Sequence, residues 1–423
     1  MLKRSLAFAL LLVLPSFLIA ADWPQWRGPL RNDISVEKGL LKSWPADGPK
    51  LLWMAEKCGN AYSGMAVVGD VVYSMGADDA KNGNREYVFA LNVKDGQEIW
   101  RKEIDAKFYS NNWGGGPRCT PTVDGEFLYV IGGGGTIACL KAKDGGVVWS
   151  KSATKDLGGN VPGWGYCESP LIDGDKLICT PGGKNGTLAA LDKKSGEVIW
   201  RSKAATDGAG YGSAIIANCV GIKQYIQFAS KGMIGVKADD GKVLWTSKTA
   251  ANGTANIPTP IVKGDDVFVT SGYGAGCGLV HLASDDKGGI TPTTVYDNRD
   301  MSNHHGGVIL VGDHIFGHSD SKGWVCMEFA TGKVVWADRT FGKGSIICAD
   351  GAFYCFSERD GSVVKIEIST AAWKETSRFK LPKSSKIRSG SGAIWTHPTI
   401  ANGRLYLRDQ DLLFCFDLRG NES

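Results

Sequence analysis

Four of the six histidines in this 423-residue chain lie in one short stretch, at His304, His305, His314 and His318. Asp320 follows two residues after the last of them. Imidazole and carboxylate groups are common ligands of zinc and copper, so the stretch has the residue types of a metal site. Histidines in a polar loop are more often simply solvated or hydrogen-bonded, and we expect no bound metal here.

Other motifs with a known chemistry are incomplete. The glycine runs at residues 114–116 and 132–135 resemble phosphate-binding loops, but neither leads into helical patterning or into a Lys-Ser or Lys-Thr pair. We therefore interpret both runs as turns. The acidic residues are dispersed through turns, and their order assigns no paired-carboxylate or Ser-His-Asp arrangement. The sequence thus predicts no catalytic residue.

The eleven cysteines show no spacing typical of a metal or haem site. No Cys-x-x-Cys occurs, which also excludes a Cys-x-x-Cys-His haem attachment site. One position of the repeat lies within a strand and holds a small core residue, which is alanine at Ala90 and Ala190. The same position is cysteine at Cys139, Cys326 and Cys415. Free cysteine fills such places well. We expect mostly buried thiols, with one or two disulfides as the open alternative.

Short segments rich in aromatic residues and histidine recur along the chain, each just ahead of a predicted strand. If the chain closes into a ring, these segments meet at one rim of its central channel. Apolar walls with a few polar groups suit a small ligand or a peptide, and flat rings suit sugars or partner side chains. The alternative is that the rings only fill the channel. The candidate binding residues are Trp113, Arg118, Trp164, Tyr166, Glu168, Tyr211, His304, His305, Trp395 and His397.

The elements that would position these segments form a repeat. Four tryptophans, the first at Trp100 and the last at Trp245, are 49, 51 and 45 residues apart. The next copy ends at Trp336, about two periods further on, so a degenerate copy is expected near Tyr296. Each copy has an apolar strand, a polar turn with glycine and a second strand that ends at the aromatic residue. Self-similarity at this period indicates a propeller or a solenoid.

Each repeat contains four short apolar strands, and Asp-Gly or Gly-Asp turns join the first two. Four antiparallel strands per repeat are the signature of a propeller blade. The register predicts an all-β, eight-bladed β-propeller over residues 50–420, with seven blades as the alternative. The last repeat stops at Asp417 after three strands. We expect the orphan strand at residues 50–55 to complete this blade and close the ring.

Residues 1–21 have the pattern of a secretory signal peptide. A basic start and an apolar run over residues 6–19 precede the small pair Ala20-Ala21. The run is short for a membrane span of about 20 residues, and no second run follows. The predicted cleavage site has no cysteine, so we expect no lipoprotein anchor. We expect an exported, soluble protein of the periplasm or cell envelope, with no transmembrane span after cleavage.

Residues 22–49 form a polar, proline-rich leader that contains Trp23, Trp26 and Trp44. We expect this leader to be extended and to lie on the surface of the domain. The formal net charge of +4 gives no basis for nucleic-acid binding. The chain is expected to be a monomer.

The repeat resembles the pyrroloquinoline quinone (PQQ) repeat, whose pattern is Ala-x-Asp-x-x-Thr-Gly-x-x-x-Trp. Ala190, Asp192, Gly196 and Trp200 match it, and the similarity covers nearly all of residues 50–418. Quinoprotein alcohol dehydrogenases share this repeat, and so do non-enzymatic propellers similar to BamB, the scaffold lipoprotein of outer-membrane β-barrel assembly. The opening Trp-Pro-Gln-Trp-Arg-Gly also resembles the leaders of exported PQQ-like propellers of planctomycete-type bacteria.

This resemblance implies that the motif tryptophan is structural and packs between neighbouring blades. The set comprises Trp53, Trp100, Trp149, Trp200, Trp245 and Trp336.

The resemblance leaves two functions open. The first is an exported, non-catalytic binding or scaffold module that holds an envelope protein, a peptide or a small ligand on the channel face. The alternative is a PQQ-dependent alcohol dehydrogenase, which would require PQQ and calcium. Relatives of that class often have two adjacent cysteines against the quinone, and this chain has no Cys-Cys pair. We favour the binding module, with neither metal nor cofactor.

Overall fold

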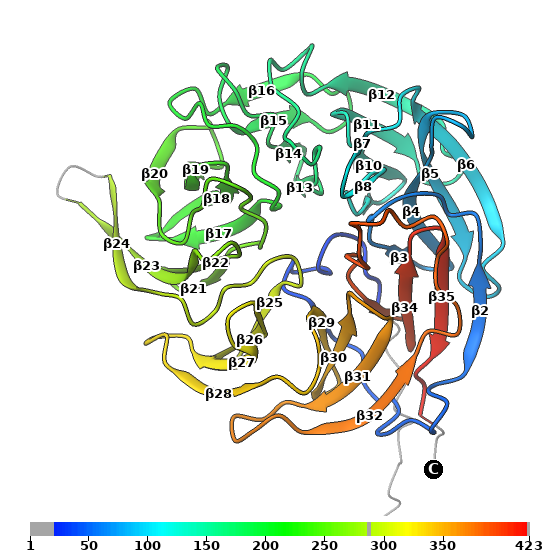
Figure 1. Cartoon of the computed structure of the whole chain (residues 1–423). Coiled ribbons are helices and arrows are strands. Elements are labelled where there is room, and N and C mark those ends of the chain that lie inside the picture. Colours follow the sequence, from blue (N-terminus) through cyan, green and yellow to red (C-terminus); the bar gives the residue numbers. More distant parts are fainter. Residues whose placement is uncertain (1–20, 286–288, 421–423) are drawn as a thin grey trace, which may run out of the picture.

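The computed structural model describes residues 21–285 and 289–420. The predicted signal peptide lies outside the described residues except for Ala21. In the described ranges the regular elements are β-strands, and eight antiparallel sheets surround a central channel (Figure 1). These ranges hold no helix long and apolar enough to cross a membrane. The predicted eight-bladed propeller is confirmed, and the seven-bladed alternative is wrong.

The first six blades each take four consecutive strands of the chain. Blade 1 contains β3 (Ala66–Val68), β4 (Val71–Asp78), β5 (Arg85–Asn92) and β6 (Glu98–Asp105). After the β7 (Ser110–Asn111) and β8 (Gly114–Gly115) hairpin, blade 2 contains β9 (Thr122–Asp124), β10 (Phe127–Ile131), β11 (Thr136–Lys141) and β12 (Val147–Ser152). Blade 3 contains β13 (Leu171–Asp173), β14 (Lys176–Cys179), β15 (Ala189–Asp192) and β16 (Val198–Arg201).

Blade 4 contains β17 (Ile215–Cys219), β18 (Ile222–Ala229), β19 (Gly232–Lys237) and β20 (Val243–Ser247). Blade 5 contains β21 (Ile261–Lys263), β22 (Asp266–Ser271), β23 (Gly276–Ser284) and β24 (Ile290–Asn298). Blade 6 contains β25 (Val308–Val311), β26 (His314–Ser319), β27 (Gly323–Glu328) and β28 (Val334–Asp338). Blade 7 contains β29 (Gly344–Ala349), β30 (Ala352–Ser357), β31 (Ser362–Glu367) and β32 (Glu375–Lys380).

Blade 8 is assembled from both ends of the chain. Its three inner strands are β33 (Thr399–Ala401), β34 (Arg404–Asp409) and β35 (Leu412–Asp417), and its outer strand is β2 (Leu51–Ala55). The β2 strand runs antiparallel to β35, with Trp53 opposite Cys415 and Met54 opposite Phe414. Because β2 pairs with β35, the outer edge of β35 is not left unpaired. The predicted closure of the ring by the N-terminal strand is confirmed.

Neighbouring blades are joined by an aromatic ring that rests on a glycine turn. Rings of Trp53, Trp100, Trp149 and Trp200 each lie against the turn glycine of the next blade, where an added Cβ would come within 2.5–2.8 Å of the ring. These glycines also have φ between 71° and 76°, which other residues adopt only with strain. In blade 5 the ring is Tyr296, whose hydroxyl donates to Phe329 O at 2.8 Å. The degenerate repeat therefore retains the contact with a different ring.

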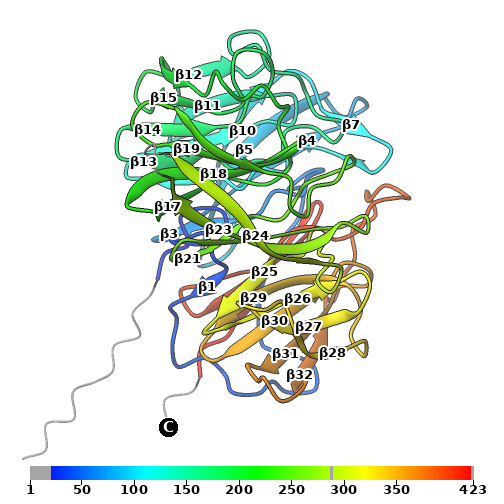
Figure 2. The ribbon, with the colours of Figure 1, turned by 90° about the vertical axis from the view of Figure 1, so that its left-hand side faces the viewer.

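The first part of the leader, residues 23–35, lies in the channel, in contrast to its expected position on the surface, whereas much of residues 36–49 is exposed and contacts blades 7 and 8. Trp23, Arg27, Arg31 and Asp33 are at most 5% exposed, and β1 (Ile34–Ser35) pairs in parallel with β29 at the inner edge of blade 7. Figure 2 shows β1 at one face of the ring and the β7–β8 hairpin at the other. The polar composition suggested solvent exposure, but ion pairs and backbone carbonyls inside the channel satisfy these side chains.

Replacement of Trp53 by alanine is expected to lower the free energy of unfolding by about 3–5 kcal/mol, the usual cost of a buried Trp-to-Ala change. The substitution removes both the ring on Gly96 and the hydrogen bond from Trp53 Nε1 to Val93 O at 2.8 Å. Urea denaturation measures the change. Ile99→Ala, at a side chain 48% exposed on β6, is the matched control and should change stability by less than about 0.5 kcal/mol. Equal stability of Trp53→Ala and the parent would contradict closure by β2.

Candidate functional site

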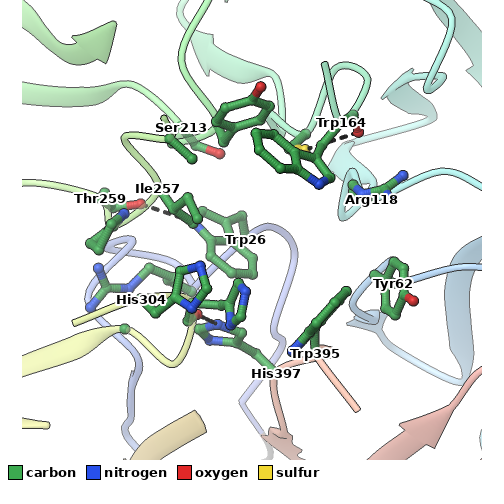
Figure 3. A pocket seen from close by; sticks show the side chains of 18 of the residues that line it. Trp26, Tyr62, Arg118, Trp164, Ser213, Ile257, Thr259, His304, Trp395 and His397 are labelled. Carbon is green, nitrogen blue, oxygen red and sulfur yellow. Dashed lines mark hydrogen bonds between the residues drawn. The ribbon is translucent and has the colours of Figure 1, made fainter. Parts of the chain in front are cut away.

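A pocket of about 400 Å³ lies at the mouth of the channel on the side of the β7–β8 hairpin (Figure 3). Its walls come mainly from the segments that precede the innermost strands, so seven blades contribute a few residues each and blade 7 contributes none. The structure brings eight of the ten candidate residues together around this space. They are Trp113, Arg118, Trp164, Tyr211, His304, His305, Trp395 and His397.

The other two candidates, Tyr166 and Glu168, lie outside the pocket. Tyr166 is 2% exposed and donates its hydroxyl to Pro181 O at 2.9 Å. The Glu168 carboxylate is 3% exposed and accepts from Thr180 N at 2.6 Å and from Gln227 Nε2 at 3.1 Å. Burial raises its pKa to about 7. A turn at Gly165, with φ 76°, directs both side chains away from the channel mouth and between the blades.

One wall of the pocket is a row of rings in contact. Tyr273 meets His304 edge-on at 4.7 Å between centroids, and His304 stacks on His305 at 3.6 Å. His305 lies 4.8 Å from Trp395, which lies 5.0 Å from Tyr62. The row crosses blades 5, 6, 8 and 1, so closure of the ring is required to form it.

The opposite part of the pocket contains Trp164, which is labelled in Figure 3. The Trp164 ring meets the ring of Tyr211 edge-on at 5.6 Å. Trp113, from the β7–β8 hairpin, is 49% exposed at the rim. Cys167 also lines the pocket and is the one cysteine that is not fully buried. All eleven cysteines are free thiols, as expected for the majority of them.

Trp26 of the leader forms part of the pocket lining together with Arg27. The Trp26 ring lies 4.6 Å from that of His397, and its Nε1–H donates to Thr259 Oγ1 at 3.2 Å. His397 in turn donates its Nε2–H to His305 O at 2.7 Å. The leader thus links the floor of the pocket to the ring wall.

The leader also blocks the channel below Trp26. The Arg31 guanidinium donates to the carbonyls of Ser169, Pro170 and Ala214, which belong to blades 3 and 4. Arg27 pairs with Asp33 at 2.6 Å. These three leader residues have φ values of 53–61°, a conformation that costs of order 1–3 kcal/mol per residue outside glycine. The buried charges and their partners hold this strained turn, and the pocket above it is a blind cup.

Sequence reasoning missed three rings of the pocket, Trp26, Tyr62 and Tyr273. Tyr62 precedes the first strand of blade 1, so the rule used for the other blades would have found it. Trp26 was assigned to a surface leader. Tyr273 lies in the turn between β22 and β23, and no sequence signal marked that turn as facing the channel.

The histidine stretch divides between two environments. His304 and His305 line the pocket, whereas His318 contacts Trp324 at 5.5 Å and His314 begins β26 opposite Glu328. Burial lowers the pKa of both His304 and His305 to about 3, with nearby Lys343 adding to the effect, so both rings are neutral at neutral pH. Within residues 21–285 and 289–420, no group of three or more His, Cys, Asp or Glu side chains is arranged to hold a metal ion.

Comparison with known proteins gives one family and several solved structures. A family model described as outer membrane protein assembly factor BamB matches residues 84–338. BamB from Moraxella catarrhalis is 16% identical, with a TM-score of 0.61 over 88% of this chain and 99% of its own. Quinohemoprotein alcohol dehydrogenase from Comamonas testosteroni is 12% identical, with a TM-score of 0.60 over 95% of this chain and 81% of its own. No curated protein matches the sequence. At these identities the structural likeness shows the fold alone.

The neutral His305 makes a testable contribution to acid sensitivity. Its pKa is about 3 in the folded protein and 6.5 when solvated, so between these values the unfolded chain binds a proton that the folded chain does not. The free energy of unfolding therefore falls as the pH drops through this window, by up to about 1.4 kcal/mol per pH unit. His305→Gln should reduce this fall in urea titrations at pH 7 and pH 4.5. Burial raises the pKa of Glu86 and Glu168 to about 7, so these two groups increase the free energy of unfolding as the pH falls. Their contribution is the same in the parent and in His305→Gln. An identical fall in the variant would show that His305 is protonated in the folded state.

Proposed function

The chain belongs to the family described as outer membrane protein assembly factor BamB, and on this basis we propose that it is a non-catalytic binding module of the cell envelope. Its channel pocket takes a flat, ring-bearing ligand or a ring-bearing side chain of a partner. The signal-peptide pattern of residues 1–21 supports export, and the lack of a cysteine at the cleavage site supports a protein without a lipid anchor.

The ring-lined blind cup is the observation that carries this proposal. Its volume of about 400 Å³ lies in the range of small-ligand sites, and most lining side chains are aromatic or apolar. Two rings are half exposed, Trp113 at 49% and Tyr273 at 48%. Exposed aromatic surface around a concavity is typical of a binding site, because a ligand that covers it removes apolar area from water.

The alternative function, a PQQ-dependent dehydrogenase, requires a quinone and a calcium ion. The rings could stack on a flat cofactor, but none of the lining residues is Asp or Glu, the ligands that calcium prefers. Of the nearby carboxylates, Asp33 is paired with Arg27 and Asp320 with Lys343. Glu358 does not line the pocket and lies 3.5 Å from Nδ1 of the lining residue His305. Cys167 is the only thiol among the lining residues and has no cysteine neighbour in sequence. The residues present do not fit PQQ with calcium, so we propose that no such cofactor is used.

Isothermal titration tests this point directly. PQQ added to the purified protein in the presence of calcium is expected to give no saturable heat, because the pocket offers no carboxylate ligand for the ion. Binding at one site per chain with micromolar or tighter affinity would contradict the proposal and restore the dehydrogenase alternative.

Binding to the pocket can be measured with N-phenyl-1-naphthylamine, an uncharged aromatic dye that fluoresces in apolar sites. We expect saturable binding to the parent protein and a roughly 3- to 10-fold weaker affinity for Trp164→Ala, since one aromatic contact contributes about 0.5–1.5 kcal/mol. Ile99→Ala, on the outer strand of blade 1, should bind like the parent. Thermal melting confirms that Trp164→Ala is folded. No binding to the parent, or equal binding by Trp164→Ala, would show that the cup is not a ligand site.

A further inference from the structure

The charges around the pocket are unbalanced. Its lining contains two guanidinium groups, Arg27 and Arg118, and no carboxylate. Arg27 is neutralised by Asp33 at 2.6 Å. Arg118 donates only to backbone carbonyls, from Nη1 to Gly116 O at 2.9 Å and from Nη2 to Gly114 O at 3.2 Å, and it forms no salt bridge with a described carboxylate.

The surroundings of Arg118 make an anion favourable. Its guanidinium carbon lies 5.1 Å from the centre of the Tyr62 ring, and the side chain is partly buried at the wall of the cup. A cation with few polar neighbours gains more from an ion pair than one in bulk water does. Its five N–H groups are also fixed in a plane that matches the oxygens of an acidic group.

Tyr273 supplies a second donor, because the direction of its hydrogen bonds is fixed by a neighbour. The Lys343 ammonium can only donate, so His304 Nδ1 accepts from it at 2.8 Å. The neutral ring then carries its proton on Nε2, which donates to the Tyr273 hydroxyl oxygen at 2.9 Å. The hydroxyl proton of Tyr273 is left for another acceptor.

Tyr273 is held in place at a cost to the backbone. Its φ of 57° is left-handed, which is uncommon for a large side chain and costs of order 1–3 kcal/mol. The edge-on contact with His304 and the hydrogen bond from its Nε2 keep the phenol at the pocket.

We propose that the ligand is a small aromatic monoanion, such as an aryl carboxylate or sulfonate. Its ring lies among the aromatic side chains of the cup, its acidic group pairs with Arg118, and an oxygen of the ligand accepts from the Tyr273 hydroxyl. The single unpaired guanidinium sets the charge at one. This assignment rests on the proposed function, that the cup is a binding site.

Two dyes with one skeleton test the assignment. 8-Anilinonaphthalene-1-sulfonate and N-phenyl-1-naphthylamine differ by the sulfonate group, so the ratio of their affinities reports the contribution of the negative charge. We expect Arg118→Met to lower this ratio about ten-fold, chiefly through weaker binding of the sulfonate dye. Tyr273→Phe should lower it about 3-fold. Arg85→Met, at a side chain 46% exposed and paired with Asp78, is the control and should leave the ratio unchanged.

Salt provides a second readout that needs no variant. For the parent protein the ratio should fall as ionic strength rises, since salt screens the attraction between Arg118 and the sulfonate. A ratio that is insensitive both to salt and to Arg118→Met would overturn the monoanion assignment while the ring-lined site stands. If neither dye binds the parent, the proposed function itself fails, and the two failures are thus distinguished.

Discussion

Blade 8 is formed by strands from opposite ends of the chain, and the geometry of the channel depends on that pairing. The β2 strand lies on β35, and the Trp53 ring next to this pairing rests on Gly96 of blade 1. The same contact of ring on glycine joins most neighbouring blades around the circle. Because every blade is held by its neighbours, closure at one point fixes where the inner segments of all eight meet.

The leader continues from the closing strand into the centre of the ring. It carries Arg31 to the carbonyls of blades 3 and 4 and Arg27 to Val308 O of blade 6, so one short segment contacts opposite sides of the channel. Charges buried in this way are costly unless every one has a partner. Here the partners are backbone carbonyls and Asp33, and the strained turn at residues 27–33 is the conformation that reaches them.

The chemistry of the pocket follows from this burial. Three histidines and two arginines line the pocket and suggest a strongly cationic site, but burial keeps His304 and His305 neutral and Asp33 neutralises Arg27. Arg118 remains as the uncompensated charge of the lining. The neutral histidines act as rings and as directed hydrogen-bonding groups, which is why Lys343 and His304 together fix the orientation of the Tyr273 hydroxyl.

The period of the tryptophans and the glycine turns predicted the blades and the closing strand and favoured eight blades over seven, because these are local patterns that repeat. Eight of the ten candidate rim residues meet at the pocket for the same reason, since each precedes an innermost strand. Tyr166 and Glu168 could not be separated from Trp164 by sequence, because the turn at Gly165 decides which side chains reach the channel. The position of Trp26 was also beyond the sequence, since its polar, proline-rich surroundings are buried only by carbonyls from distant blades. Tertiary structure alone decided which charges are paired, and therefore that one arginine of the lining lacks a partner.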